Sequence, residues 1–223
     1  MVLRRTIPAT ASVVKKMNGD RLHSPAAAKN VGHITELVCS VSPKNGTALE
    51  IASGTGQHII KLAAVIPNLT WQPSDIDTAR LNSIVSWSFE KQLPNLLPPI
   101  KLDVTDEGWS ALCPNQDLIL LVNLLHLVSE SEAKVIIDGI SKSLMPGGRC
   151  VIYGPFMRDG SLTSDGDKCF HQSLVEADPD IGYKDDKWML DMFQNYNLEI
   201  VKIANMPANN LAFVIEKNHL KHS

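Results

Sequence analysis

The chain has 223 residues, of which 44% are hydrophobic and 20% are charged, and its formal net charge is -3 at pH 7. These values are ordinary for one globular domain, so they exclude a disordered or fibrous protein, and the slightly acidic charge gives no indication of a nucleic-acid partner. No apolar run approaches the roughly 20 residues that a membrane-spanning helix needs. We therefore expect a soluble protein with no membrane association.

The N-terminus is basic and has no acidic residue before Asp20. Its basic side chains are Arg4, Arg5, Lys15 and Lys16. This composition is typical of a mitochondrial transit peptide, but solvated basic tails are also common at chain ends. We expect a flexible basic extension over residues 1–21, a single domain over 22–217 and a short tail over 218–223.

The four cysteines are widely spaced and form no pair or Cys/His cluster of the kind that zinc sites require. They indicate reduced thiols in a reducing compartment, and we expect no metal site. The protein is accordingly expected inside the cell, in the cytoplasm or nucleus, with mitochondrial import as the alternative that the basic N-terminus leaves open.

Hydrophobic periodicity predicts alternating helices and strands. The first helix begins at Ser24-Pro25, where a hydroxyl N-cap precedes a proline in the first turn, and its apolar spacing continues to Val41. Further helices are predicted over 57–66, 78–91, 131–144 and 187–196, and strands over 47–52, 70–74, 100–104, 118–124, 149–153, 199–204 and 212–216. This alternation predicts an α/β, Rossmann-like fold: a mainly parallel seven-stranded sheet with helices on both faces and an antiparallel C-terminal hairpin.

Residues 154–183 interrupt the alternation. They are rich in Gly, Asp and Ser, with one short helical pattern near 170–176. Plain connections between elements are usually much shorter. We interpret this segment as a lid or a substrate-binding loop.

The candidate site begins at the end of the first predicted strand, because ligands of open α/β sheets bind beyond the carboxyl ends of the strands. Gly54 and Gly56 allow the backbone to approach a ligand closely, and Glu50 lies near the strand end. A dinucleotide site would favour a small residue three positions after Gly56, where Ile59 stands, so NAD is disfavoured. S-adenosylmethionine carries no phosphate and needs acceptors for its amino group and ribose hydroxyls, which carboxylates and glycine carbonyls supply.

The next strand ends carry further polar groups. Asp75 follows the second strand and is expected to accept hydrogen bonds from both ribose hydroxyls, while Asp103, after the third, is expected to accept one from the adenine amine. The fourth strand leads into Asn123 and His126, of which His126 is either a base or orienting group at the methyl-transfer face or a buried structural histidine. His58 is expected to pack beside the cofactor.

Other enzyme classes lack support. The Gly-x-Ser-x-Gly elbow of serine hydrolases does not occur, and no Gly-Lys-Ser/Thr sequence follows the glycines, as a phosphate-binding loop would require. Methyl transfer needs no dedicated nucleophile, because catalysis can rest on holding the acceptor in line with the methyl group.

Over about residues 22–217 the sequence resembles the methyltransferase-like protein 26 family. The matching motifs are Ser24-Pro25-Ala26-Ala27 with Asn30, Glu50 to His58, Trp71-Gln72-Pro73-Ser74-Asp75, Leu102-Asp103-Val104, Asn123 with His126, Tyr153-Gly154-Pro155, Gly182, Asp185 and Met206-Pro207-Ala208-Asn209-Asn210. The resemblance implies a Rossmann-like methyltransferase that binds S-adenosylmethionine. It leaves the acceptor, a small molecule or a protein, undefined.

The expected site residues follow from these motifs. For the cofactor they are Glu50, Ala52, Ser53, Gly54, Gly56, His58, Asp75, Asp103 and Asn123. For catalysis they are Asn123 and His126, and for the acceptor they are Asn30, Tyr153, Pro155, Asn209 and Asn210.

The sequence departs from the family pattern on the acceptor side. The departures are at Ala28, Gly166, Asp167, Cys169 and His171. These departures are compatible with an altered acceptor. They are also compatible with the alternative to an active methyltransferase, a catalytically silent protein that binds the cofactor or a partner through the same fold.

Overall fold

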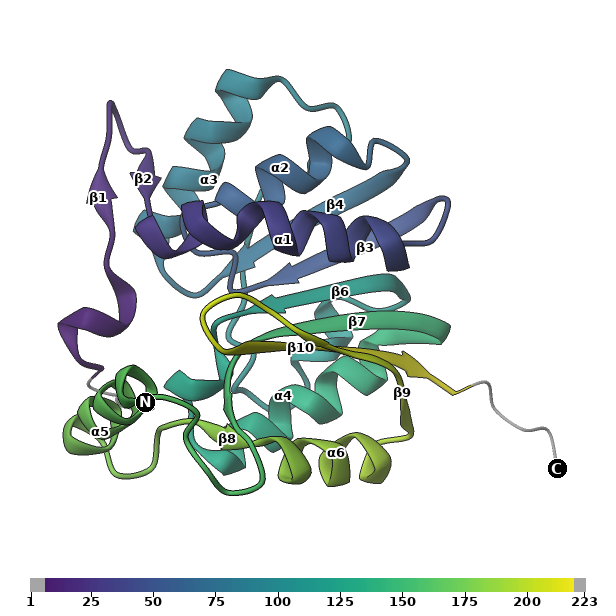
Figure 1. The fold of residues 1–223 in the computed structure, drawn as a ribbon. Coiled ribbons are helices and arrows are strands. Elements are labelled where there is room, and N and C mark those ends of the chain that lie inside the picture. Colours follow the sequence, from purple (N-terminus) through teal and green to yellow (C-terminus); the bar gives the residue numbers. More distant parts are fainter. Residues whose placement is uncertain (1–6, 219–223) are drawn as a thin grey trace, which may run out of the picture.

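The computed structural model describes residues 7–218 and shows an α/β fold in which one sheet lies between two layers of helices (Figure 1). The strands are β1 (Lys15–Lys16), β2 (Leu22–His23), β3 (Gly46–Ile51), β4 (Leu69–Asp75), β5 (Ile100–Lys101), β6 (Gln116–Val122), β7 (Leu144–Met157), β8 (Lys184–Asp185), β9 (Leu198–Asn205) and β10 (Asn210–Lys217). The helices are α1 (Pro25–Val41), α2 (Gln57–Val65), α3 (Thr78–Lys91), α4 (Glu130–Ser143), α5 (Asp165–Ala177) and α6 (Asp186–Asn195), and the 3-10 turns are η1 (Ala9–Ser12), η2 (Trp109–Leu112) and η3 (Leu125–Leu127).

The main sheet has the strand order β5-β4-β3-β6-β7-β10-β9, and β8 pairs with β7 off this path. Strands β3 to β7 run parallel, whereas β10 is antiparallel to both β7 and β9. The predicted fold and its C-terminal hairpin are thus confirmed. The strand order reverses between β3 and β6, and this reversal is the point at which open α/β sheets bind ligands.

Strand β6 shows why both faces of the sheet must be covered. Leu118 and Leu120 pack with α1 and α2 on one face, and Ile119 and Leu121 pack with α4 and α6 on the other. All four side chains are fully buried. A strand buried on both faces has a continuous apolar sequence, so its run of leucines and isoleucine needs a helix layer on each side.

Several predicted boundaries differ from the observed ones. Strand β7 covers 144–157 instead of 149–153, strand β5 ends at Lys101 instead of residue 104, and helix α5 covers 165–177 where only 170–176 was expected. Pairing with β8 and β10 supports the longer β7, and packing of Leu174 with Ile181 and Tyr183 supports α5, so both depend on tertiary contacts that local propensity does not indicate.

Residues 7–24, here called the N-terminal strap, comprise η1 and the β1-β2 hairpin and run across the carboxyl ends of the strands (Figure 1). The strap is attached to α3, because the Leu22 amide donates to Ser83 Oγ at 2.8 Å and Trp87 Nε1 donates to the Leu22 carbonyl at 3.2 Å. The flexibility expected for residues 1–21 stays a prediction, and residues 1–6 lie outside the described part. Within residues 7–218, no helix combines the length and apolarity that crossing a membrane requires.

Candidate functional site

A cavity of about 1050 Å³ opens where β3, β4, β5 and β6 end. Its wall includes most of the residues that the sequence assigns to the cofactor. These are Glu50, Ala52, Ser53, Gly54, His58, Asp75, Asp103 and Asn123. Gly56 lies just behind the wall as the N-cap of α2. The strand ends therefore bring the expected carboxylates and the glycine loop to one place.

The glycine loop turns through a left-handed backbone. Ala52, Gly54 and Gly56 have φ values of 52°, 59° and 89°. A Cβ on Gly56 would lie 3.1 Å from Ile84 Cγ1, so the loop packs closely against α3 and a side chain there would require Ile84 to shift. Ala52 tolerates a conformation that is unfavourable for a residue with a Cβ, and such strain concentrates at ligand sites.

Glu50 is the most deeply buried acid of the cavity, with 1% of its surface exposed. Burial raises its pKa to about 8. Its Oε2 atom has no hydrogen-bond partner among the residues that the structure describes. A buried polar atom without a partner is rare and costs stability, so this oxygen is suited to accept a hydrogen bond from a ligand, above all from an ammonium group.

Asp75 is oriented by the backbone on both sides. Its Oδ2 accepts the Gly54 amide at 2.9 Å and its Oδ1 accepts the Asp77 amide at 2.9 Å. Burial raises the pKa of Asp75, and those two amides and the Arg80 guanidinium act in the opposite direction. Each carboxylate oxygen keeps a second lone pair, so the fixed carboxylate can still accept two hydroxyls of a ribose.

Asp103 is oriented through one oxygen. Its Oδ1 accepts the Thr105 amide at 3.0 Å and the Thr105 hydroxyl at 2.6 Å. These contacts hold the side chain at the cavity wall and leave Oδ2 to a ligand donor such as an exocyclic amine.

His58 links the cavity wall to two buried residues with polar side chains, Asn30 and Tyr153. Burial lowers its pKa to about 4, so the ring is neutral at pH 7. His58 Nε2 lies 2.8 Å from Asn30 Oδ1, an acceptor, and therefore carries the proton. Asn30 also contacts the Tyr153 hydroxyl. Asn30 and Tyr153, expected to bind the acceptor, lie behind His58 and outside the cavity lining.

The two candidate catalytic residues have different surroundings. Asn123 lines the cavity with a left-handed backbone, φ 54°, and its amide donates to the Tyr153 carbonyl at 2.8 Å. His126 is buried outside the lining, with Phe170 and Tyr183 packed edge-on against its ring. Burial and the nearby Lys184 lower the pKa of His126 to about 3. The structure thus places Asn123, but not His126, at the cavity wall.

The remaining acceptor candidates also lie away from the wall. Asn209 donates from Nδ2 to Asp167 Oδ2 at 3.1 Å, and the Tyr183 hydroxyl donates to Asp167 Oδ1 at 3.1 Å. Asp167, one of the departures from the family pattern, therefore joins α5 to the loop between β9 and β10. Asn210 donates within that loop to the Pro207 carbonyl at 2.8 Å, and Pro155 pairs with Asn210 across β7 and β10. The roles assigned to these residues stay predictions.

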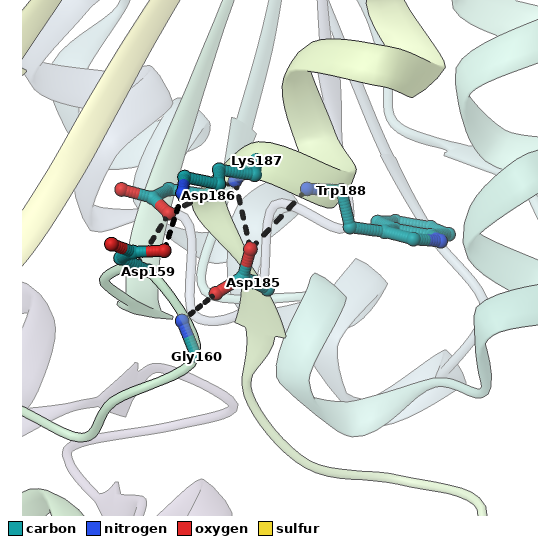
Figure 2. Close-up of polar contacts among 6 residues, drawn as sticks. All are labelled: Asp159, Gly160, Asp185, Asp186, Lys187 and Trp188. Carbon is teal, nitrogen blue, oxygen red and sulfur yellow. Dashed lines mark hydrogen bonds and ion pairs between the residues drawn. The ribbon is translucent and has the colours of Figure 1, made fainter.

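The segment that carries α5 is anchored at its start by the N-terminus of α6 (Figure 2). Asp185 Oδ2 accepts the Gly160 amide at 2.6 Å, and Asp186 Oδ1 accepts the Asp159 amide at 2.9 Å. Lys187 forms an ion pair with Asp159. These contacts fix the turn between β7 and α5 to the body of the domain.

Two features of the site were missed by the sequence analysis. The strap lines the cavity through Ser12, and the Arg80 guanidinium donates to the Ser12 hydroxyl. A Cβ on Gly54 would lie 3.1 Å from Arg80 Nη1, so Arg80 covers the glycine loop. Arg80 stands in the first turn of α3, where a cation opposes the helix dipole. That unfavourable position is a sequence signal that could have indicated a special role.

The family described as "Protein of unknown function (DUF938)" matches residues 21–217. Several solved structures resemble the fold. An O-methyltransferase family protein from Burkholderia thailandensis superposes with a TM-score of 0.75 and 16% sequence identity, over 88% of this chain and 57% of that chain. Human N-acetylserotonin methyltransferase in complex with SAM superposes with a TM-score of 0.71 and 14% identity, over 87% of this chain and 53% of that one.

A third structure, an O-methyltransferase family 2 protein from Planctomyces limnophilus in complex with apigenin, superposes with a TM-score of 0.70 and 16% identity, over 86% of this chain and 60% of that one. The chain therefore spans little more than half the length of these neighbours. At such identities the likeness shows a shared fold.

Proposed function

Because the chain belongs to the DUF938 family and carries this site on a fold shared with methyltransferases, we propose that it is an S-adenosylmethionine-dependent methyltransferase. The observation that carries the proposal is the buried Glu50 Oε2, which has no hydrogen-bond partner among the described residues and belongs to a residue that lines the cavity together with Asp75 and Asp103. An ammonium, a ribose diol and an adenine amine are the donor groups that complement these three carboxylates. Within the family, the motifs support a relationship to methyltransferase-like protein 26.

The donor set fits the cofactor residue by residue. Glu50 would bind the ammonium of the methionine end, Asp75 the ribose hydroxyls and Asp103 the adenine amine. The neighbouring structures that were solved with SAM or S-adenosylhomocysteine support S-adenosylmethionine as the cofactor. When bound, S-adenosylmethionine supplies a methyl group on a positively charged sulfur.

The protein's own residues would position the reactants and exclude water. Asn123 stands at the end of β6, where its side chain can orient the acceptor beside the methyl group. His126, buried under Phe170 and Tyr183, would position the turn that follows Asn123. Holding the acceptor in line with the methyl group would lower the activation free energy, by an effect that can supply roughly 7–11 kcal/mol.

The second candidate function is a silent protein that binds the cofactor without transferring the methyl group. The burial of His126 favours it, because this histidine does not reach the cavity as a base would have to. Transfer of labelled methyl groups to any product separates the two functions.

Calorimetric titration with S-adenosylmethionine, S-adenosylhomocysteine and NAD tests the proposal. We expect saturable binding of both adenosyl ligands and none of NAD, because Ile59 is fully buried where a dinucleotide fold favours a small residue. Binding of NAD alone would contradict the proposal.

A further inference from the structure

Beyond Asn123 the cavity has an apolar end. It is lined by Ile7 and Ala11 from the strap and by Leu124, Leu127 and Val128 from the turn after β6. This set of five side chains is here called the apolar end. It carries no charge and no hydrogen-bonding side chain, in contrast to the carboxylates at the strand ends.

The apolar end is supported from behind. Ile7, Ala11 and Leu127 also pack against a hydrophobic cluster around Leu174 and Ile181, which belongs to the segment that carries α5. These three side chains therefore face the cavity on one side and a packed core on the other. Such a wall has a defined shape, which a binding subsite requires.

Two hydrogen bonds fix the turn after β6 that contributes to the apolar end. The Gly182 amide donates to the His126 carbonyl at 3.1 Å, and Lys184 Nζ donates to the Val128 carbonyl at 2.7 Å. The neighbouring acid that lines the cavity, Glu132, is held by the capping box of α4, where its Oε2 accepts the Ser129 amide at 2.7 Å. The segment that carries α5 thus shapes the cavity without lining it.

The cavity is large for a ligand site. A pocket for one drug-sized ligand typically has a volume of about 300–1000 Å³. The volume of about 1050 Å³ at this site lies at the upper limit of that range. The three carboxylates stand at the ends of β3, β4 and β5, whereas the strap and the turn after β6 form the apolar end, so a cofactor on the carboxylates would leave the apolar end to a second small molecule.

We propose that the apolar end is the acceptor subsite and that the acceptor is a small, mainly apolar molecule. This inference rests on the proposed function and extends it to a substrate class. In the reaction, a lone pair of the acceptor forms the new bond to the methyl carbon, the electron pair of the carbon–sulfur bond goes to sulfur, and a proton released by the acceptor passes to water. A polypeptide acceptor would need hydrogen-bond partners for its backbone, which these five apolar side chains do not offer.

The test is a fluorescence titration of the full chain, saturated with S-adenosylhomocysteine, with the uncharged apolar dye Nile red. Leu127→Gln and Ile7→Gln each place an amide in the lining of the subsite, one from the turn after β6 and one from the strap. Leu112→Gln is the matched control, because Leu112 is 71% exposed on η2 and does not line the cavity. We expect one saturable dye site, weakened about tenfold by each wall variant and unchanged by the control. Binding of S-adenosylhomocysteine, measured in parallel, should be equal in all four proteins.

The outcomes separate the two proposals. If S-adenosylhomocysteine binds but the dye does not saturate, or if the wall variants bind the dye as tightly as the control, the acceptor subsite is refuted and the proposed function stands. If both wall variants lose S-adenosylhomocysteine binding together with the dye, a separate subsite is refuted as well. If the unsubstituted protein binds no S-adenosylhomocysteine, the proposed function fails and this inference fails with it.

Discussion

The Gly54 amide donates a 2.9 Å hydrogen bond to Asp75 Oδ2, which joins the glycine loop after β3 to the carboxyl end of β4. The bond fixes the carboxylate before any ligand arrives, and Arg80 covers the same glycine from above. The glycine loop and the Asp75 carboxylate therefore hold each other in a fixed arrangement. A ligand that binds there needs little rearrangement of the protein, which reduces the entropic cost of binding.

Gly56, which has a left-handed backbone in the glycine loop, should not tolerate a side chain. We expect Gly56→Ala to lower stability by more than the ~1–2 kcal/mol that a left-handed conformation costs, because the new Cβ would lie 3.1 Å from Ile84 Cγ1. Gly108→Ala is the matched control, since Gly108 has a similar φ of 83° and no atom within 4 Å of its Cβ position. Thermal unfolding of the two variants measures the difference. Equal losses would show that contact with α3 is unimportant.

Binding of the cofactor should release a proton from Glu50. The pKa of Glu50 is raised to about 8, so this carboxyl group is protonated at pH 7, and an ammonium bound beside it favours the ionised form. Affinity for S-adenosylhomocysteine should therefore rise as the pH rises toward about 8 and level off above it. Calorimetry in buffers of different ionisation enthalpy detects the released proton.

Glu50→Gln is the control for this proton release. The variant keeps the shape of the side chain and cannot ionise, so its binding enthalpy should be independent of the buffer. Proton release of the same size in the variant would assign the titration to another group.

The buried His126 should make stability depend on pH. Its pKa is lowered from 6.5 to about 3, so between these values the unfolded chain binds a proton that the folded protein does not. Stability must then fall as the pH falls from about 6.5 toward 3, by at most about 1.4 kcal/mol per pH unit for this group. His126→Leu should reduce that slope, and the groups that contribute to the remainder include His58, whose pKa burial lowers to about 4, and His171, whose pKa burial also lowers. Denaturant unfolding at several pH values measures the slope, and an unchanged slope in the variant contradicts the assignment.

The periodic part of the fold was predictable, because buried strands and amphipathic helices have strong sequence patterns. The run at Leu118–Leu121 indicated a strand covered on both faces, and Asp75 and Asp103 were located by their places after strands. In a parallel sheet the carboxyl ends meet at one edge, so local pattern was sufficient to bring these residues together.

The strap and the burial of His126 depend on long-range packing and were not predictable. Strands β1 and β2 have two residues each, too few for a periodic pattern. His126 lies beside Phe170 and Tyr183, which are more than forty positions away in the chain. Nothing in the residues around His126 indicates this contact, so the sequence left open whether His126 is a base at the methyl-transfer face or a buried structural histidine.

The most direct measurement is a calorimetric titration of S-adenosylhomocysteine into the unsubstituted protein, Asp75→Asn and Asp117→Asn. Asp117 is the matched control, because it also accepts a backbone amide, that of Thr47 at 2.8 Å, but lies at the other end of the strands. We predict saturable binding that Asp75→Asn weakens by roughly 1.5–3 kcal/mol, the value of a hydrogen bond to a charged group, and that Asp117→Asn leaves unchanged. The absence of binding to the unsubstituted protein, or equal affinity in Asp75→Asn, would contradict a cofactor site at the carboxyl ends of β3 and β4.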